Sequence, residues 1–284
     1  MTYTTLIDVD SLAAHLGDPA FAIIDCRYNP NDEAWGRAEY LAKHIPGAGF
    51  ADMDHDLAGP QTGRNGRHPL PDPAALTRTL SRLGIASDTQ MIAYDQGAGM
   101  YASRLWWLLR WMGHDAVAVL DGGFAKWLAT GRPTSAGEER RTSREFTGLP
   151  RLEMSLDTDR VLKLSRNRDW RLLDARAPER YRGETEPIDK VAGHIPGATN
   201  HFFMRNLNEA GAFRSPEELR RLFRQALDEV EPAHVVCYCG SGVTACQNLL
   251  ALEHAGLRGA KLYPGSWSEW SSDPARPIGC GDEI

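Results

Sequence analysis

The sequence predicts an α/β protein built from two tandem copies of one domain, each a parallel sheet with helices on both faces. Two observations predict this class. Short apolar runs alternate with helical patterns, and much of the first half of the 284-residue chain recurs in the second half. Alternation of this kind is typical of parallel sheets, because a crossover between parallel strands is usually made by a helix. The length also suits two ordinary domains.

Two short motifs carry the repeat. The sequence HIPGA occurs at 44–48 and again, unchanged, at 194–198, and an Asp-x-Arg motif at 25–27 recurs at 174–176. The motifs keep their order, as expected for a duplicated domain whose connecting loops differ in length. Between the copies lies a stretch rich in Pro, Gly and charged residues without a sustained apolar period. We therefore expect a first domain over 1–138, a linker over 139–151 and a second domain over 152–284.

The elements of each copy follow from local patterns. Apolar runs predict three buried strands in each copy, at 21–25, 91–94 and 117–120 and then at 171–174, 234–238 and 260–263. Residues that favour helix N-termini predict three of the helices, which begin after Asp72, after Ser215 and near Ala245. Gly84 and Gly256 are placed to end the first and the third of these helices.

Composition excludes several classes of function. The net charge of −6 argues against a nucleic-acid partner held by a broad basic surface, and no apolar run is long enough to span a membrane. No secretory signal is visible at the N-terminus, so we expect a cytoplasmic protein. The five cysteines are an odd number in a chain long enough to fold without disulfides, so we expect free thiols.

Chemistry is expected where strands end, because ligands of open parallel sheets bind beyond the carboxyl ends of the strands. In the second copy the strand ending at Tyr238 is followed by Cys239, Gly240, Ser241, Gly242, Val243 and Thr244, and then by a helix. Backbone N–H groups of such a turn favour a thiolate over a thiol, and the two glycines allow the N–H groups to point inward. Cys239 is therefore the candidate nucleophile. In the first copy Asp95 stands at the same place.

The same turns bear on two other functions. Residues 97–102 and 240–245 both fit the G-x-G-x-x-A pattern of dinucleotide-binding turns, which keeps a dinucleotide-dependent oxidoreductase as an alternative. A cysteine phosphatase would need an arginine six residues after the nucleophile, but position 245 is alanine.

The repeated HIPGA and Asp-x-Arg motifs, together with the turn Cys-Gly-Ser-Gly-Val-Thr at 239–244, resemble the two-domain rhodanese-type sulfurtransferases over nearly the whole chain. The resemblance implies two tandem rhodanese-like domains, of which the first lacks the cysteine and is inactive. It also implies that Cys239 takes a sulfane sulfur from a donor as a persulfide and passes it to cyanide or a thiol. A binding module without activity would lack the nucleophile, which is present.

The turn is similar to that of the mercaptopyruvate branch. The thiosulfate branch, which stays as an alternative, carries Arg and Lys where this chain has Gly240 and Ser241, so we expect no fixed cation beside the sulfur. By resemblance, Arg180 and Lys190 bind the donor together with the turn, although lysine replaces the usual arginine and lacks its planar fork. By resemblance too, Ser241 would act with His68 and Asp54.

The resemblance further implies a small-molecule donor, a thioredoxin-like reductant as a partner, and no cofactor or metal. Residues present in both copies, including His44, His194 and the Asp174–Arg176 pair, are expected to fix turns and loops rather than to react. We expect Cys26, Cys237 and Cys280 to be small core residues, and Cys246 to be buried rather than joined to Cys239. Arg64 and Arg67 flank glycines near His68, and a solvated loop and a substrate rim fit them equally well.

Overall fold

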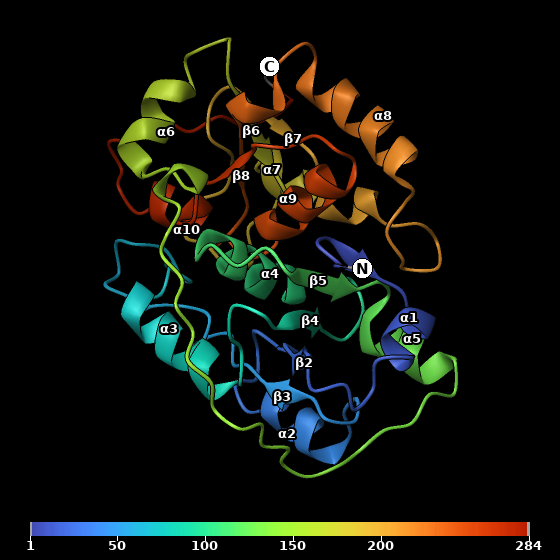
Figure 1. Ribbon diagram of the computed structural model, residues 1–284. Helices are drawn as coiled ribbons and strands as arrows, with labels where there is room; N and C mark the ends of the chain where they lie inside the picture. The colour runs from blue at the N-terminus through green and yellow to red at the C-terminus, as the bar shows by residue number, and fades with distance from the viewer. Residues whose placement is uncertain (1, 283–284) are drawn as a thin grey trace. The chain divides into compact units, whose positions relative to one another are not determined.

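A computed structural model describes residues 2–282 and divides the chain into two compact units (Figure 1). Unit 1 comprises the residues up to Gly59, Pro71–Arg151 and Glu209–Phe213. Unit 2 comprises Pro60–Leu70, Leu152–Asn208 and the residues from Arg214 onward. Each unit therefore includes a short segment that the sequence places in the other half of the chain.

Unit 1 is a five-stranded parallel sheet in the order β1-β5-β4-β2-β3. The strands are β1 (Leu6–Ile7), β2 (Phe21–Asp25), β3 (Gly49–Phe50), β4 (Gln90–Tyr94) and β5 (Val117–Leu120). The helices are α1 (Val9–Ala13), α2 (Trp35–Ala42), α3 (Pro73–Arg82), α4 (Ala102–Trp111) and α5 (Gly123–Ala129).

Both faces of this sheet are covered. Leu12 of α1 and Trp127 of α5 pack in one cluster with alternate strand residues such as Ile23 and Ile92. Helix α4 packs on β4 and β5 but contributes no residue to that cluster, so it lies on the opposite face. Side chains alternate between the two faces of a strand, which is why every residue of β2 and β4 is buried.

Unit 2 repeats this plan with a four-stranded parallel sheet in the order β7-β6-β8-β9. The strands are β6 (Arg171–Asp174), β7 (Ala198–Asn200), β8 (Val235–Tyr238) and β9 (Lys261–Leu262). The helices are α6 (Thr158–Leu164), α7 (Pro178–Tyr181), α8 (Pro216–Leu227), α9 (Ala245–His254) and α10 (Ser266–Trp270). Single 3₁₀ turns lie at Leu152–Met154, Phe203–Asn206 and Pro232–His234.

The predicted fold class is confirmed, and so are the six predicted strands to within a residue or two at their ends. Asp72 caps α3 by accepting the N–H of Ala75, and Ser215 forms a capping box with Glu218 at the start of α8. The strands β1, β3 and β7 were not predicted, because they have only two or three residues and no longer apolar run marks them in the sequence.

The repeated Asp-x-Arg motif forms the same buried structure in both units. In unit 2, Arg176 Nη2 lies 2.6 Å from Asp174 Oδ2 and 2.6 Å from the carbonyl oxygen of Gly193. In unit 1, Arg27 contacts Asp25 and the carbonyl oxygen of Lys43 in the same way. Both pairs are almost fully buried, so each charge depends on the other for compensation. The motif thus anchors the loops that carry HIPGA.

The repeated histidines act in the same structure. His194 Nδ1 lies 2.8 Å from the carbonyl oxygen of Tyr181 and His44 Nδ1 lies 2.7 Å from that of Tyr40. Each imidazole also stacks on the tyrosine ring. The expectation that these residues fix turns is confirmed.

Among residues 2–282, no helix combines the length and the apolar character that a membrane span requires.

A buried polar network joins the end of β7 to α9. His201 Nε2 lies 2.9 Å from Asn206 Oδ1, and the Asn206 amide donates to Gln247 Oε1 and Asn248 Oδ1 at 2.8 and 2.7 Å. Asn248 returns a hydrogen bond to the carbonyl oxygen of His201. Burial lowers the pKa of His201 to about 4, so the imidazole is neutral in the folded protein at pH 7.

This histidine makes the stability of unit 2 sensitive to acid. The ordinary pKa of a histidine is about 6.5, so below this pH the unfolded chain binds a proton at position 201. The folded chain accepts that proton only near pH 4. The free energy of unfolding should therefore decrease as the pH falls from about 6.5 to 4. Urea titrations at pH 7 and pH 5 should show a smaller decrease for His201→Gln than for the wild-type protein. An equal decrease in both would contradict this assignment.

Candidate active site

Cys239 follows β8 directly, at the carboxyl edge of the sheet of unit 2, and α9 begins six residues later. The N–H of Gly242 donates to Cys239 Sγ over 3.1 Å, and the residue is only 2% exposed. A backbone N–H near the start of a helix favours negative charge on the sulfur. The structure thus shows one N–H of the predicted turn, that of Gly242, directed at the sulfur.

The backbone of this turn requires its second glycine. Gly242 has φ of +80°, and a Cβ at this position would lie 2.3 Å from the carbonyl oxygen of Pro264. A left-handed backbone alone costs a residue with a side chain about 1–2 kcal/mol, and the steric clash adds to that cost. Only glycine turns the N–H at position 242 toward the sulfur without strain.

Ser266, the first residue of α10, holds the other side of the nucleophile. Its hydroxyl accepts the N–H of Cys239 over 3.1 Å and donates to the carbonyl oxygen of Tyr263 over 2.9 Å. Ser266 is fully buried and has φ of +54°, which is uncommon for a residue with a side chain. Strained residues gather at functional sites, where the surrounding structure holds them in place. The sequence analysis assigned no role to this residue, although the repeat aligns it with Gly123, whose φ is also positive at +57°.

The matching turn of unit 1 is filled by its own carboxylate. Asp95 accepts four backbone N–H groups, from Gly97, Gly99, Tyr101 and Ala102, over 2.9 to 3.2 Å. Burial raises the pKa of Asp95, and the four donors oppose that effect by stabilising the charged form. The same kind of anion-binding turn thus surrounds a thiol in unit 2 and a carboxylate in unit 1.

The structure brings two of the predicted residues together. His68 Nδ1 lies 2.8 Å from Ser241 Oγ, although the two residues are 173 positions apart in the sequence. They meet because the segment Pro60–Leu70 belongs to unit 2. Asp54 belongs to unit 1, where its carboxylate lies beside the hydroxyl of Tyr28; burial and then this carboxylate raise the pKa of that tyrosine.

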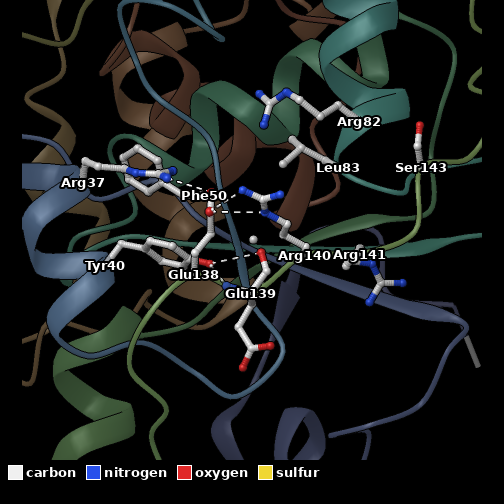
Figure 2. A pocket seen from close by; sticks show the side chains of 11 residues that line it. Arg37, Tyr40, Phe50, Arg82, Leu83, Glu138, Glu139, Arg140, Arg141 and Ser143 are labelled. Atoms are coloured by element: carbon white, nitrogen blue, oxygen red, sulfur yellow. Dashed lines mark hydrogen bonds and ion pairs between the residues drawn. The ribbon is translucent and has the colours of Figure 1, made fainter.

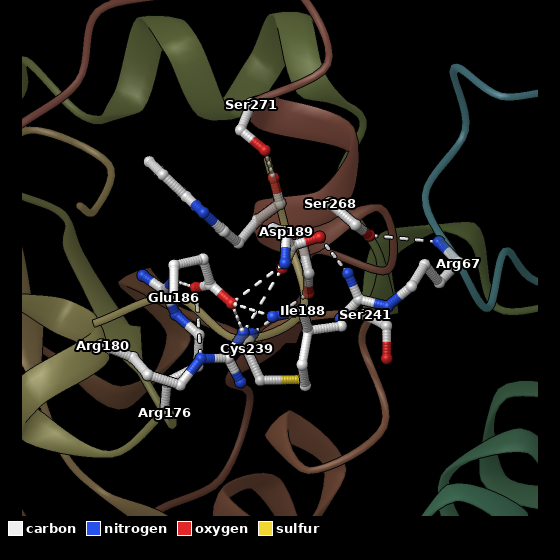
Figure 3. A network of polar contacts seen from close by, with 12 residues as sticks. Arg67, Arg176, Arg180, Glu186, Ile188, Asp189, Cys239, Ser241, Ser268 and Ser271 are labelled. Carbon is white, nitrogen blue, oxygen red and sulfur yellow. Dashed lines mark hydrogen bonds and ion pairs between the residues drawn. The ribbon is translucent and has the colours of Figure 1, made fainter. Parts of the chain in front are cut away.

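Arg180 lies at the turn, as predicted. A Cβ added at Gly240 would lie 3.6 Å from Arg180 Nη2, and Arg180 Nη2 makes a hydrogen bond of 2.6 Å to Glu186 Oε1 (Figure 3). Lys190, by contrast, is exposed and makes no ion pair within the described residues. Val243 is buried in the turn, and Thr244 precedes α9 without capping it through its side chain.

Arg67, for which the sequence favours neither a solvated loop nor a substrate rim, lies against the turn. A Cβ added at Gly240 would lie 2.8 Å from Arg67 Nη2, nearer than any atom of Arg180. A cation that the sequence of the turn did not predict therefore lies beside Gly240, the residue after the nucleophile. The cation comes from a loop far away in the sequence instead of from the turn itself.

The other cysteines do not compete with Cys239. Cys26 and Cys237 are buried as expected, and burial raises the pKa of both thiols. Cys280 was expected in the core but is exposed, because it lies beyond the last helix. Cys246 is buried and its thiol donates to the carbonyl oxygen of Gly242 over 3.3 Å. All five cysteines are free.

Unit 1 has a cavity of about 380 Å³ that contains none of the predicted site residues (Figure 2). Glu138 at its wall pairs with Arg37 over 2.8 Å and with Arg140 over 2.9 Å, so these charges compensate one another. Neither a cysteine nor a histidine lines it. Within residues 2–282, no three His, Cys, Asp or Glu side chains are grouped in a way that could hold a metal ion.

Comparison with known proteins identifies the class. The chain matches the rhodanese-like domain family twice, over residues 8–130 and 157–273, and it belongs to this family. Each unit contains a strand, an anion-binding turn and a helix in that order, and the turn carries a cysteine in unit 2 only. This arrangement fits a tandem rhodanese-type sulfurtransferase. Family membership favours sulfur transfer over the dinucleotide-dependent alternative.

Relatives carry the names of two donors. The chain is 45% identical to a protein of Pseudomonas aeruginosa named a probable 3-mercaptopyruvate sulfurtransferase, over 99% of this chain and 100% of the relative. It is 40% identical to a putative thiosulfate sulfurtransferase, SseB, of Mycobacterium tuberculosis, over 93% and 92%. Its fold is similar to the crystal structure of SseA from Escherichia coli, described with the 3-mercaptopyruvate sulfotransferases. The TM-score is 0.81 with 34% identity, over 93% and 99% of the two chains.

The filled turn of unit 1 predicts that a cysteine there does not suffice for activity. In the aligned turns, Gln96 and Gly97 stand at the positions of Gly240 and Ser241, so unit 1 lacks the hydroxyl beside the nucleophile. We expect Asp95→Cys to bind one sulfane sulfur per chain after reaction with a donor, like the wild-type protein. Cyanolysis of the isolated protein counts these sulfurs. Two per chain, or one per chain in Asp95→Cys combined with Cys239→Ser, would contradict the prediction.

Proposed function

We propose that this protein transfers a sulfur atom from 3-mercaptopyruvate to a thiol or cyanide through a persulfide on Cys239. The observation that carries the proposal is the 2.8 Å contact between His68 Nδ1 and Ser241 Oγ, two residues beyond the nucleophile. This contact provides an exchangeable proton close to the sulfur. The name of the relative from Pseudomonas aeruginosa supports the same donor.

The transfer is a displacement at sulfur. The thiolate of Cys239 attacks the sulfur of mercaptopyruvate, an S–S bond forms, and the C–S bond breaks. The electron pair of the C–S bond leaves with the carbon fragment as the enolate of pyruvate, so the enzyme holds the transferred sulfur as Cys–S–SH. An acceptor such as cyanide then attacks the outer sulfur and leaves as thiocyanate, which returns the thiolate of Cys239.

Only one of the two candidate donors needs a proton for its leaving group. The enolate of pyruvate takes up one proton, which the Ser241 hydroxyl donates and recovers from His68. Sulfite, the leaving group from thiosulfate, needs none. A role for Asp54 in orienting His68 stays a prediction from the family resemblance.

Thiosulfate is the second candidate donor. The Arg67 guanidinium lies against Gly240, where it can stabilise a donor whose charge is next to the transferred sulfur. The name of the relative from Mycobacterium tuberculosis supports this donor. We therefore infer activity with both donors and a preference for mercaptopyruvate.

The acceptor in the cell is inferred from the chemistry of the persulfide. A thiol that attacks the outer sulfur leaves with it, and a thioredoxin-like dithiol can then release that sulfur as sulfide. Five free cysteines suit a reducing compartment, which supports a location in the cytoplasm.

The first prediction from this function concerns the sulfur carrier. Cys239→Ser should abolish thiocyanate formation from either donor without changing the urea midpoint of unfolding, because an alcohol cannot form a persulfide. Cys280→Ser, which replaces an exposed cysteine, is the control and should retain full activity. Residual turnover by Cys239→Ser, above that of a boiled sample, would contradict the proposal.

The second prediction separates the donors. Ser241→Ala should lower kcat/KM for mercaptopyruvate about 100-fold, a typical contribution of a general acid, and should change kcat/KM for thiosulfate far less. His68→Gln should act in the same direction. Steady-state rates with both donors, at one cyanide concentration, provide the test. An equal loss for both donors would show that the pair is structural and not a source of protons.

A further inference from the structure

Beside Cys239, positive and negative side chains alternate in one connected series (Figure 3). It starts in the core, where Arg176 pairs with Asp174 and also contacts Glu186 over 3.3 Å. Glu186 holds Arg180, and Arg180 Nη2 contacts Asp189 over 3.4 Å. Asp189 finally pairs with Arg67. Three carboxylates thus face three guanidinium groups, so the series has no positive charge left for an anionic donor.

The two outer carboxylates of this series are held very differently. Glu186 accepts hydrogen bonds from two guanidinium groups and from the backbone N–H groups of Ile188 and Asp189, over 3.1 and 3.0 Å. Burial opposes its charge, but these donors keep the pKa of Glu186 below its usual value. For Asp189, burial is the stronger effect and raises the pKa above its usual value.

The contacts of the Asp189 carboxylate explain this difference. Among the described residues, only Arg67 and Arg180 bind it, and no backbone N–H does. Its side chain is nevertheless only 7% exposed. A carboxylate held only by two guanidinium groups can be exchanged for another carboxylate without breaking a backbone hydrogen bond.

Arg67 is fixed to the turn from its backbone. Its N–H donates to Ser268 Oγ over 3.1 Å, and the N–H of Ser268 donates to the carbonyl oxygen of Gly240 over 2.9 Å. Gly66 has φ of +80° and lies close to Gly265: a Cβ added at Gly66 would be 2.6 Å from the carbonyl oxygen of Gly265. The guanidinium of Arg67 is therefore held beside Gly240 by the fold as well as by Asp189.

We propose that Arg67 joins Arg180, whose role in donor binding the family resemblance already implies, in a clamp for the anionic end of the sulfur donor, and that Asp189 occupies this clamp until the donor displaces it. The inference rests on the proposed function, because it assigns the donor's anionic group to this clamp. Asp189 is an internal substitute for the donor's carboxylate. While Asp189 occupies the clamp, Cys239 is only 2% exposed.

The assignment has a direct energetic consequence. Binding of the donor requires the loss of the two Asp189 contacts, and this cost lowers the observed affinity. Removal of the Asp189 charge should therefore tighten binding of a carboxylate, whereas removal of a residue that merely orients Arg67 should weaken it. If Asp189 occupies the clamp, its replacement lowers the Kd for a carboxylate; if it only orients Arg67, its replacement raises that Kd.

The first experiment tests Arg67. We expect Arg67→Ala and Arg67→Gln to raise KM for mercaptopyruvate about tenfold or more, with kcat changed less than about threefold, because a charged contact to the donor is lost. Arg64→Ala is the matched control, since Arg64 is exposed in the same loop and KM should not change. A KM for both Arg67 variants equal to that of Arg64→Ala would overturn the proposal.

The second experiment tests Asp189 without turnover. Pyruvate, a carboxylate that cannot transfer sulfur, is titrated calorimetrically into Cys239→Ser and into the same protein carrying Asp189→Asn. We expect pyruvate to bind at least about threefold more tightly when Asp189 is replaced. The control is Glu184→Gln, which removes an exposed carboxylate nearby and should leave the Kd unchanged. Unchanged or weaker binding of pyruvate in Asp189→Asn would overturn the proposal that Asp189 occupies the clamp.

The failure of the proposed function is distinguishable from the failure of this inference. If the wild-type protein forms no thiocyanate from mercaptopyruvate, the proposed function fails whatever the clamp does. If turnover is normal but the Arg67 variants or Asp189→Asn behave as their controls, the proposed function stands and the clamp is wrong.

Discussion

The turn between β8 and α9 is the constraint on which the rest of unit 2 depends. A backbone N–H reaches the sulfur of Cys239 only because Gly242 adopts a left-handed conformation against Pro264. Ser266, itself in a left-handed conformation, fixes the N–H of Cys239 from the other side. The parallel sheet supplies the strand end and the helix start that this geometry requires. The position of the sulfur thus depends on two residues with positive φ, Gly242 and Ser266.

Charge compensation distinguishes the two units. Each contains a turn that attracts anions, and in unit 1 a carboxylate of the chain, Asp95, satisfies it permanently with four N–H groups. In unit 2 the thiol occupies the turn, and the nearby guanidinium groups of Arg67 and Arg180 hold the weakly fixed Asp189. An anion held by many backbone donors stays in place, and one held by two side chains can be exchanged. The duplicated fold therefore contains one turn filled by a carboxylate and one turn that carries a thiol.

The sequence predicted what is encoded locally. The strand, the glycine turn and the helix at Cys239 follow one another within a few residues, so the order of residues alone is enough to recognise them. The role of Arg67 could not be predicted in this way, because it depends on the loop Pro60–Leu70 packing into unit 2. The glycines at 63 and 66, both on its N-terminal side, were the only local signal. The contrast between Glu186 and Asp189 also arises from backbone contacts that no sequence pattern shows.

The central claim is that a single cysteine carries the sulfur, and intact mass spectrometry tests it most directly. The wild-type protein, reacted with mercaptopyruvate in the absence of an acceptor and then desalted, should gain the mass of one sulfur atom. Peptide mapping under non-reducing conditions should place that sulfur on Cys239, and addition of cyanide should remove it. An unchanged mass in a protein that turns over, or a sulfur mapped to another cysteine, would contradict the account.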